Sequence, residues 1–521
     1  MTDTATQTAT SAGPQVEPTT GTHRRSDLVI VYHRQPYEEV EEGGRTVLRE
    51  NASPNGIVPT LKGFFGQVDH AAWVAWKHAD DPSNPGFDRV IEIADSFGTY
   101  AVSRLPLTPA QVTSFYHVTS KEAFWPILHG FKETYNYDPV DWPTFREVNW
   151  AFAEAAAAEV APGGVVWVHD YNLWLVPGYL RRLRPDARIV FFHHTPFPGA
   201  DMFATLPWRG EIVESLLACD AVGFHIPRYA RNFTAVAEAQ AGAEVSEEIP
   251  TPEEMAPMGG ALTARRLPLA LDYEGRRIRV HTNPVGANFG YIERLAGTDE
   301  VAAKVAAIRE DMGDGQLILS VSRTDYTKGN IEQLETFERL LERRPELHGR
   351  VRLMLVSVGA NRAMTAYEEV QRRIEELTGR INGRFGSFEW QPVALISTVI
   401  PLAELVAYYR AADICSITPL ADGLNLVASE FCAAQGEGAK GVLVLSEFAG
   451  CAVTLQGAVP VNPFSHASMD RGLDQALDMD AEEALGRMTA LRRSARRWDI
   501  EAWTQRELAL FADLRAEAAA G

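Results

Sequence analysis

Short, continuous apolar runs recur along the chain, separated by longer stretches with helical periodicity. Such runs are typical of parallel strands that are buried on both faces. They lie at residues 28–32, 165–168, 188–192, 221–224, 317–321, 351–356, 414–417 and 442–445. The stretches between them, for example 150–159, 331–344 and 366–378, are long enough for the helical crossovers that parallel strands need. This alternation predicts an α/β fold with helices on both faces of parallel sheets.

The strand pattern ends near Val285-Gly286 and restarts near Leu317, after a charged helical stretch. A chain of 521 residues is long enough for two or three domains. We therefore predict two Rossmann-like, doubly wound lobes. The predicted units are a disordered tail (1–26), an N-terminal lobe (27–295), a C-terminal lobe (296–490) and a C-terminal helix that packs back on the first lobe (491–521). Two smaller predictions are a surface loop at 241–258 and a hairpin strand at 276–280.

Charge and composition exclude several classes of protein. The chain has 49 basic and 69 acidic residues, a net charge of −20, which argues against a nucleic-acid-binding face. A few local Arg and Lys side chains could still bind a small anion. No apolar run reaches the roughly 18–20 residues that cross a bilayer, so no membrane span is expected. The tail has no secretory apolar region, and Arg24-Arg25, followed by a buried strand, is a poor twin-arginine export signal. Four cysteines without a CxxC pair indicate reduced thiols and a cytoplasmic protein.

Functional residues are expected directly after the strands, because ligands of open parallel sheets bind at the carboxyl ends of strands, here in the cleft between two lobes. In the first lobe, His169-Asp170-Tyr171 and His193-His194-Thr195 hold such positions. Three histidines and an aspartate at neighbouring strand ends indicate a polar site. Histidines satisfied by the backbone remain an alternative, and so does zinc, although no HxxxH or HExxH spacing supports it.

In the second lobe, Arg323 and Lys328 stand on a turn that follows a strand and precedes a helix. A guanidinium, an ammonium and a helix N-terminus together suit a diphosphate. Further on, Asp422-Gly423 forms a turn whose amides can face a ligand, and Glu430 in the next helix could accept both hydroxyls of a ribose. The alternative for these groups is an ordinary solvated surface.

Six motifs of the chain occur together and in a fixed order. They are His169-Asp170-Tyr171, His194–Pro198, Leu206–Arg209, Arg323 with Asp325–Gly329, Ile381–Phe385 and Asp422–Val427. They resemble the trehalose-6-phosphate synthase family, whose members are retaining, metal-independent glycosyltransferases of the GT-B fold without a cofactor. The resemblance covers residues 27–510. It implies a nucleotide-sugar donor, a small phosphorylated acceptor and an active site between the lobes; a homo-oligomer is compatible with it.

Other segments resemble one subfamily, the glucosylglycerol-phosphate synthases. They are Tyr32–Tyr37, Ser53–Gly56, Trp73–Lys77, Phe115–Pro126, Asp170–Trp174 and Phe224–Tyr229. This resemblance implies transfer of glucose from ADP-glucose to glycerol 3-phosphate, for compatible-solute synthesis.

The resemblance also implies roles for individual residues. Arg323 and Lys328 would hold the donor diphosphate and stabilise it as it leaves, and Gly56 would bring backbone close to it. Asp170 and His194 would lie at the reacting sugar. The donor glucose would be held by Asp422, Gly423, Leu424, Asn425, Leu426 and Val427, and the ribose by Glu430. The acceptor side would comprise Arg34, Trp73, Tyr116, Trp125 and Tyr171.

Departures from the family pattern keep other functions open. Ala421 and Ser429 stand where the family commonly has Arg and Lys, so a pseudo-glycosyltransferase that joins a nucleotide-activated cyclitol to an amino-cyclitol phosphate is one alternative. Asn361, beside Arg362, stands where an acceptor-phosphate Arg is usual, which disfavours glucose 6-phosphate and thus trehalose-6-phosphate synthesis. A catalytically silent sensor or scaffold is a further alternative. A dehydrogenase is disfavoured, because no GxGxxG follows a strand.

Overall fold

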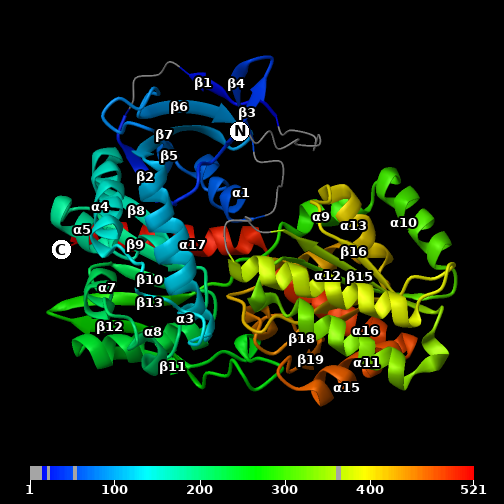
Figure 1. Ribbon diagram of the computed structural model, residues 1–521. Coiled ribbons are helices and arrows are strands. Elements are labelled where there is room, and N and C mark those ends of the chain that lie inside the picture. The colour runs from blue at the N-terminus through cyan, green and yellow to red at the C-terminus, as the bar shows by residue number, and fades with distance from the viewer. Residues whose placement is uncertain (1–13, 20–23, 51–55, 360–364, 521) are drawn as a thin grey trace.

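The computed structural model describes residues 14–19, 24–50, 56–359 and 365–520, and within these ranges it shows two large sheets with helices on both faces (Figure 1). The alternation of strands and helices predicted from the sequence is confirmed. The larger sheet belongs to the first half of the chain and the smaller one to the second half. Among the described residues, no helix is both long and apolar enough to cross a membrane.

The first sheet has the strand order β1-β6-β7-β5-β2-β8-β9-β10-β13-β12-β11. Its strands are β1 (Glu17–Thr19), β2 (Ser26–Val31), β5 (Ala71–His78), β6 (Val90–Asp95), β7 (Gly98–Leu107), β8 (Val160–His169), β9 (Arg188–His193), β10 (Ala221–Phe224), β11 (Glu244–Pro250), β12 (Arg266–Tyr273) and β13 (Arg276–Thr282). The centre, from β7 to β13, is parallel, and antiparallel strands extend it at both edges. Chain order reverses between β2 and β8.

The second sheet is wholly parallel, with the order β16-β15-β14-β17-β18-β19. Its strands are β14 (Gln316–Arg323), β15 (Val351–Val358), β16 (Val393–Ile396), β17 (Ile414–Ile417), β18 (Val442–Ser446) and β19 (Val459–Val461). This is the order of the Rossmann fold, and it reverses between β14 and β17. Ligands bind such sheets at the reversal point, beyond the carboxyl ends of the two strands.

Helices follow the strands in both halves. The first half has α1 (Ile57–Lys62), α2 (Pro109–Val112), the π-helix η2 (Thr113–Phe124), α3 (Trp125–His129), α4 (Trp142–Glu159), α5 (Val176–Leu183), α6 (Ala200–Phe203), α7 (Arg209–Leu216) and α8 (Pro227–Ala241). The second has α9 (Phe289–Ala296), α10 (Asp299–Met312), α11 (Asn330–Arg343), α12 (Thr365–Phe385), α13 (Leu402–Ala411), α14 (Leu426–Ala434), α15 (His466–Leu477), α16 (Ala481–Arg497) and α17 (Ile500–Ala520). A separate hairpin joins β3 (Glu38–Glu42) to β4 (Arg45–Arg49).

The last helix returns to the first sheet (Figure 1). Trp503 of α17 is fully buried and stacks on Trp167 of β8, with ring centroids 5.3 Å apart. Farther along, Arg515 donates to the carbonyl of Asp27 across 2.6 Å. The chain therefore ends against its own N-terminal lobe.

Two expectations about irregular segments are wrong. Residues 17–19, placed in a disordered tail, form strand β1, which pairs with β6, and the neighbouring Val16 is buried. Residues 244–250, placed in a surface loop, form strand β11, which pairs with β12. The predicted hairpin strand at 276–280 is confirmed, since β12 and β13 pair in antiparallel register.

Candidate active site

Residues that follow the reversal points of the two sheets lie close to one another: Tyr32, directly after β2, interacts electrostatically with Asp170 and with Arg323 of the other lobe. The loop after β17 crosses to the first lobe: the backbone carbonyl of Asp422 accepts a hydrogen bond from the Tyr229 hydroxyl, 3.1 Å away. Gly423 lies so close that a Cβ atom there would be 2.2 Å from the carbonyl oxygen of His194. Only glycine fits at such an approach, so this residue lets backbone from one lobe reach backbone of the other.

Lys328 and Asp422 form an ion pair at the reversal point of the second sheet. The Lys328 Nζ lies 2.7 Å from Asp422 Oδ2, and the two side chains are 12% and 14% exposed. Asn425 donates to the same carboxylate oxygen at 3.1 Å. Burial alone would raise the pKa of Asp422, but the Lys328 ammonium holds it below its usual value. The carboxylate is therefore ionised and fixed in place at neutral pH.

Arg323 ends strand β14, one short turn before Lys328. Its side chain is exposed, unlike that of Lys328. The guanidinium nevertheless interacts electrostatically with Tyr116 and Lys121 of the first lobe and with Tyr367 of the second. Its charge thus lies between the lobes, as the predicted contact with a diphosphate requires.

Asp170 follows β8 at the reversal point of the first sheet. Its backbone has φ 70° and ψ 164°, a region that non-glycine residues rarely adopt. The carboxylate accepts hydrogen bonds from the backbone N–H of His194 at 3.3 Å and from the Thr195 hydroxyl at 3.5 Å. Burial raises the pKa of Asp170 to about 6, even though backbone N–H donors oppose the shift.

Two histidines beside Asp170 share a hydrogen bond. The Nδ1 of His169 and the Nε2 of His194 are 3.0 Å apart, and their rings stack. Burial lowers the pKa of both well below the usual value, so both rings are neutral and one donates to the other. Among the residues that the structure describes, no group of three or more His, Cys, Asp or Glu side chains is placed to hold a metal ion.

Aromatic and basic side chains gather on the first lobe beside Asp170. Arg34, which follows β2, donates to the Tyr116 hydroxyl at 3.4 Å. Trp125 lies beside Tyr171, with ring centroids 6.2 Å apart. Arg34 also interacts electrostatically with Tyr171, so four of the five residues predicted on the acceptor side are neighbours. Trp73 is different: it is fully buried and donates to the Arg34 carbonyl at 2.8 Å, so it positions Arg34 from the core.

The remaining predicted donor residues lie in two places. Glu430 is buried in α14 and accepts a hydrogen bond from the Tyr409 hydroxyl at 3.0 Å, and burial raises its pKa. Leu424, Leu426 and Val427 belong to the turn and first residues of α14, where Asn425 is the N-cap. Gly56 precedes α1 with φ 123°, and a Cβ there would meet no atom within 4 Å. Ser53, Pro54, Asn55, Asn361 and Arg362 lie outside the described residues.

Three polar residues at this site did not emerge from the sequence: His33, Lys121 and His129. Lys121 stands five residues after Tyr116, and its side chain gives no local sequence signal of a site. Because η2 is a π-helix, residues five apart share a face, which places the ammonium 5.7 Å from the Tyr116 ring centroid. His129 ends α3 and interacts electrostatically with Lys328 and Asp422.

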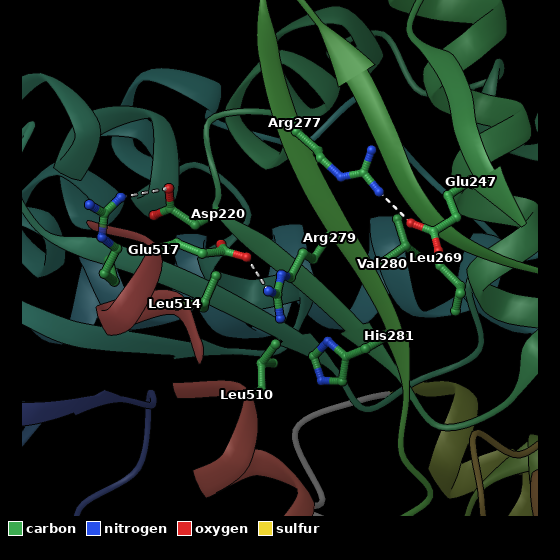
Figure 2. Close-up of a pocket in the computed structure, with 11 residues that line it drawn as sticks. Asp220, Glu247, Leu269, Arg277, Arg279, Val280, His281, Leu510, Leu514 and Glu517 are labelled. Atoms are coloured by element: carbon green, nitrogen blue, oxygen red, sulfur yellow. Dashed lines mark hydrogen bonds and ion pairs between the residues drawn. The ribbon is translucent and has the colours of Figure 1, made fainter. Parts of the chain in front are cut away.

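A surface cavity of about 540 Å³ lies elsewhere, between β13 and α17 (Figure 2). Its lining includes Arg188, Arg279 and Leu510. Arg188 begins β9 and Asp220 directly precedes β10, so this part of the cavity lies at the amino ends of the parallel strands. Figure 2 shows Arg279 paired with Glu517 of α17. Because parallel sheets bind their ligands at the carboxyl ends, we do not place the reaction here.

Known proteins with related sequences and structures are glycosyltransferases. The model of the family described as Glycosyltransferase family 20 matches residues 26–513. A glucosylglycerol-phosphate synthase of Synechocystis sp. is 49% identical, over 92% of this chain and 96% of that protein. Another, of Picosynechococcus sp., is 44% identical over 95% and 99%. The crystal structure of an α,α-trehalose-phosphate synthase (UDP-forming) from Burkholderia vietnamiensis superposes with a TM-score of 0.82 at 30% identity, over 95% of this chain and 99% of that one. The chain has the GT-B fold of these structures.

Proposed function

The chain belongs to glycosyltransferase family 20, and from this premise we propose that it transfers glucose from a nucleoside-diphosphate glucose, ADP-glucose, to glycerol 3-phosphate. The product would be glucosylglycerol phosphate. The acceptor follows from the two glucosylglycerol-phosphate synthases, which match almost the whole chain. One observation supports the chemistry above all. Arg323 and the Lys328–Asp422 pair of the second lobe lie next to Asp170 and His194 of the first lobe, where the lobes touch.

The leaving group of this reaction is a nucleoside diphosphate. As the anomeric C–O bond breaks, negative charge grows on the phosphate oxygen, and fixed cations stabilise that transition state more than the ground state. Arg323 ends β14, and Lys328 lies two residues before α11, whose N-terminus adds a favourable dipole. No metal is needed for this step. Each contact would lower the activation barrier by about 3–4 kcal/mol, which is the loss seen when one such donor is removed.

We propose that the anomeric configuration is retained by attack on the same face that the diphosphate leaves. A double displacement would need a second, free carboxylate to act as nucleophile. Asp422 is ionised but paired with Lys328, and the Asp170 carboxylate already accepts hydrogen bonds from the His194 backbone N–H and the Thr195 hydroxyl, which makes both poor nucleophiles. In the proposed route, the acceptor oxygen forms the new bond to the anomeric carbon, and its proton passes to the departing phosphate oxygen. Asp170 and the neutral His194 would hold hydroxyls of the sugar.

All four cysteines are free and buried, which supports a reducing compartment, and we propose that the enzyme acts in the cytoplasm. The similarity to the trehalose-phosphate synthase structure supports a second candidate function, which is the transfer of glucose to glucose 6-phosphate. The two functions use the same donor chemistry and differ only in the acceptor.

The proposal is tested by pairing several nucleotide sugars with glycerol 3-phosphate and with glucose 6-phosphate, and by measuring nucleotide release, product mass and anomeric configuration. We expect release that depends on glycerol 3-phosphate and is fastest with ADP-glucose. Arg323→Met and Lys328→Met should each lower kcat about 100- to 1,000-fold. Lys304→Met, in the exposed helix α10, is the matched control and should keep full activity. Release that requires glucose 6-phosphate instead would support the second candidate, and no release with either acceptor would refute both.

A further inference from the structure

Lys121 differs from other enclosed lysines, such as Lys62, in having no carboxylate partner within the described part of the chain. Lys62, which is fully buried, makes an ion pair with Asp95 at 2.6 Å. Lys121 is half-buried, and among the described residues it makes no ion pair; its Nζ instead lies 4.0 Å from the centroid of the Trp125 ring. An aromatic face attracts a cation without neutralising it. A desolvated, unneutralised ammonium is costly unless an anion binds there.

Arg34 adds a second charge of the same kind. Its guanidinium donates a hydrogen bond to the neutral Tyr116 hydroxyl, at 3.4 Å. Lys121 approaches the same Tyr116 ring at 5.7 Å, so the tyrosine lies between two cations. Burial lowers the pKa of Lys121, Tyr116 opposes that shift, and the Arg323 guanidinium adds to it. Three positive charges thus act on one small region.

His33 marks the same region as a place for a polar ligand. His33 is 5% exposed, and neither of its ring nitrogens has a hydrogen-bond partner among the residues that the structure describes. Buried polar groups in native proteins nearly always have a partner. The His33 ring lies against that of Tyr116, with centroids 5.3 Å apart. Burial, and then the charges of Arg34 and Lys121, lower the pKa of His33 well below its usual value, so it offers hydrogen bonds but no charge.

The nearby carboxylates do not balance these cations. Asp325 and Asp170 both interact electrostatically with Lys121. Asp325, however, caps the turn before α11 by accepting from the Thr327 backbone, and Asp170 accepts from the His194 backbone. The donor diphosphate would engage Arg323 and Lys328. The cations on the first lobe therefore have capacity for a second anion.

We infer that Lys121, with Arg34, binds the phosphate of the acceptor, and that this contact selects phosphorylated acceptors over their free alcohols. The inference rests on the proposed glucosyl transfer. Because Lys121 is in electrostatic range of both Asp170 and Arg323, a phosphate held by it lies near the reacting centre, which favours an acceptor as short as a three-carbon polyol.

The kinetic test compares glycerol 3-phosphate with glycerol as acceptor for the wild-type enzyme and Lys121→Met. Loss of one charge-assisted contact should lower the ratio of their kcat/KM values about 30-fold. The lower ratio should result from a higher KM for glycerol 3-phosphate. Lys121→Arg should restore most of the wild-type ratio. A purely structural role would lower both kcat/KM values equally and leave the ratio unchanged, which would overturn the inference. Lys304→Met is again the control.

A binding test separates this inference from the proposed function. Isothermal titration of inorganic phosphate into the wild-type enzyme should show binding that Lys121→Met weakens at least tenfold, with no glucosyl transfer involved. If phosphate binding is lost while the wild-type enzyme transfers glucose to neither acceptor, the phosphate site stands and the proposed function fails. Equal phosphate affinity in the two proteins would refute the site, whatever the enzyme transfers.

Discussion

At the scale of single residues, Asp170 combines two unfavourable features. Its backbone takes a conformation that costs about 1–3 kcal/mol for a residue with a side chain. Its amide nevertheless donates to the Phe192 carbonyl at 2.9 Å, so the neighbouring strand β9 holds the strained turn in place. Burial also opposes ionisation of its carboxyl group. Strain and burial concentrated in one residue at a strand end indicate a functional role rather than a structural one.

Asp170→Asn should make the protein more stable at neutral pH and less active. The pKa of Asp170 is about 6 in the folded protein, against about 3.9 in an unfolded chain. As pH rises from 3.9 to 6, the folded state holds a proton that the unfolded state has lost, so the carboxyl group destabilises the fold increasingly. Above pH 6 the full cost is about 1–3 kcal/mol, and the substitution removes it.

Urea unfolding measures this effect, as the difference between variant and wild type at pH 8 and at pH 4. The gain should be present at pH 8 and nearly absent at pH 4. Asp314→Asn, at an exposed position, should change stability at neither pH. A gain that is equal at both pH values would show that the pKa of Asp170 is not raised.

At the scale of elements, the turn between β17 and α14 joins the lobes through Gly423. Gly423→Ala would place a methyl group 2.2 Å from the His194 carbonyl and 3.0 Å from the Thr195 Cα, and both are backbone atoms of the other lobe. Such overpacking costs about 1–3 kcal/mol. Moving the turn also displaces the Asp422 carboxylate, so we expect turnover to fall more steeply than stability.

Gly383→Ala is the matched control for this turn. Gly383 is exposed in helix α12, where a Cβ meets no atom within 4 Å, so the substitution should raise stability by about 0.5–1 kcal/mol without changing turnover. Thermal unfolding and steady-state assays of both variants check the pair. Full activity of Gly423→Ala would contradict the close contact between the lobes.

The sequence predicted those elements whose stability comes from burial. Leu28, Val29, Ile30 and Val31 of β2 are all fully buried, and such a run predicts a central parallel strand without further information. Strands β1 and β11 depend instead on pairing with one neighbour at a sheet edge. The acidic residues of β11 resemble those of a loop, because an edge strand needs little apolar surface.

The residues of the site also fall into those that a local pattern predicts and those that depend on contacts between distant elements. Asp170, His194 and Arg323 could be predicted because each lies at the end of an apolar run. Lys121 and His129 could not, because their role depends on how η2 and α3 approach the other lobe. The polar group next to Lys328 is a residue nearly a hundred positions away, Asp422, and no local pattern encodes such a pairing.

At the scale of the whole molecule, α17 ties the end of the chain to the first lobe. Its Trp503 packs edge-on against Phe64 and stacks on Trp167. Trp503→Ala should lower the free energy of unfolding by about 3–5 kcal/mol, because the cavity it leaves is enclosed by large aromatic groups. Denaturant unfolding provides the measurement, and Trp150→Ala at an exposed position should cost far less. If Trp503→Ala costs as little as Trp150→Ala, α17 contributes little to the stability of the fold.

Buried neutral histidines should make the whole fold sensitive to acid. Burial lowers the pKa of His129 and His225 to about 4 and that of His193 to about 3, against about 6.5 in an unfolded chain. Between these values the unfolded state binds protons that the folded state excludes, so stability is complete above pH 6.5 and falls as the pH falls. His33, His169 and His194 add to this loss, because burial lowers their pKa as well, whereas Asp170 and Glu430, whose pKa is raised, act in the opposite direction.

Urea unfolding at pH 7.5 and pH 5.0 measures the sum of these groups. At pH 5.0 each of the three histidines should cost about 2 kcal/mol and Asp170 should return about 1, so these four groups alone give a net loss of about 4–5 kcal/mol. His129→Gln should reduce the loss by the share of one histidine. Unchanged stability at pH 5.0 would mean that these rings gain protons without unfolding, and therefore that water or a counter-ion reaches the place where the lobes meet.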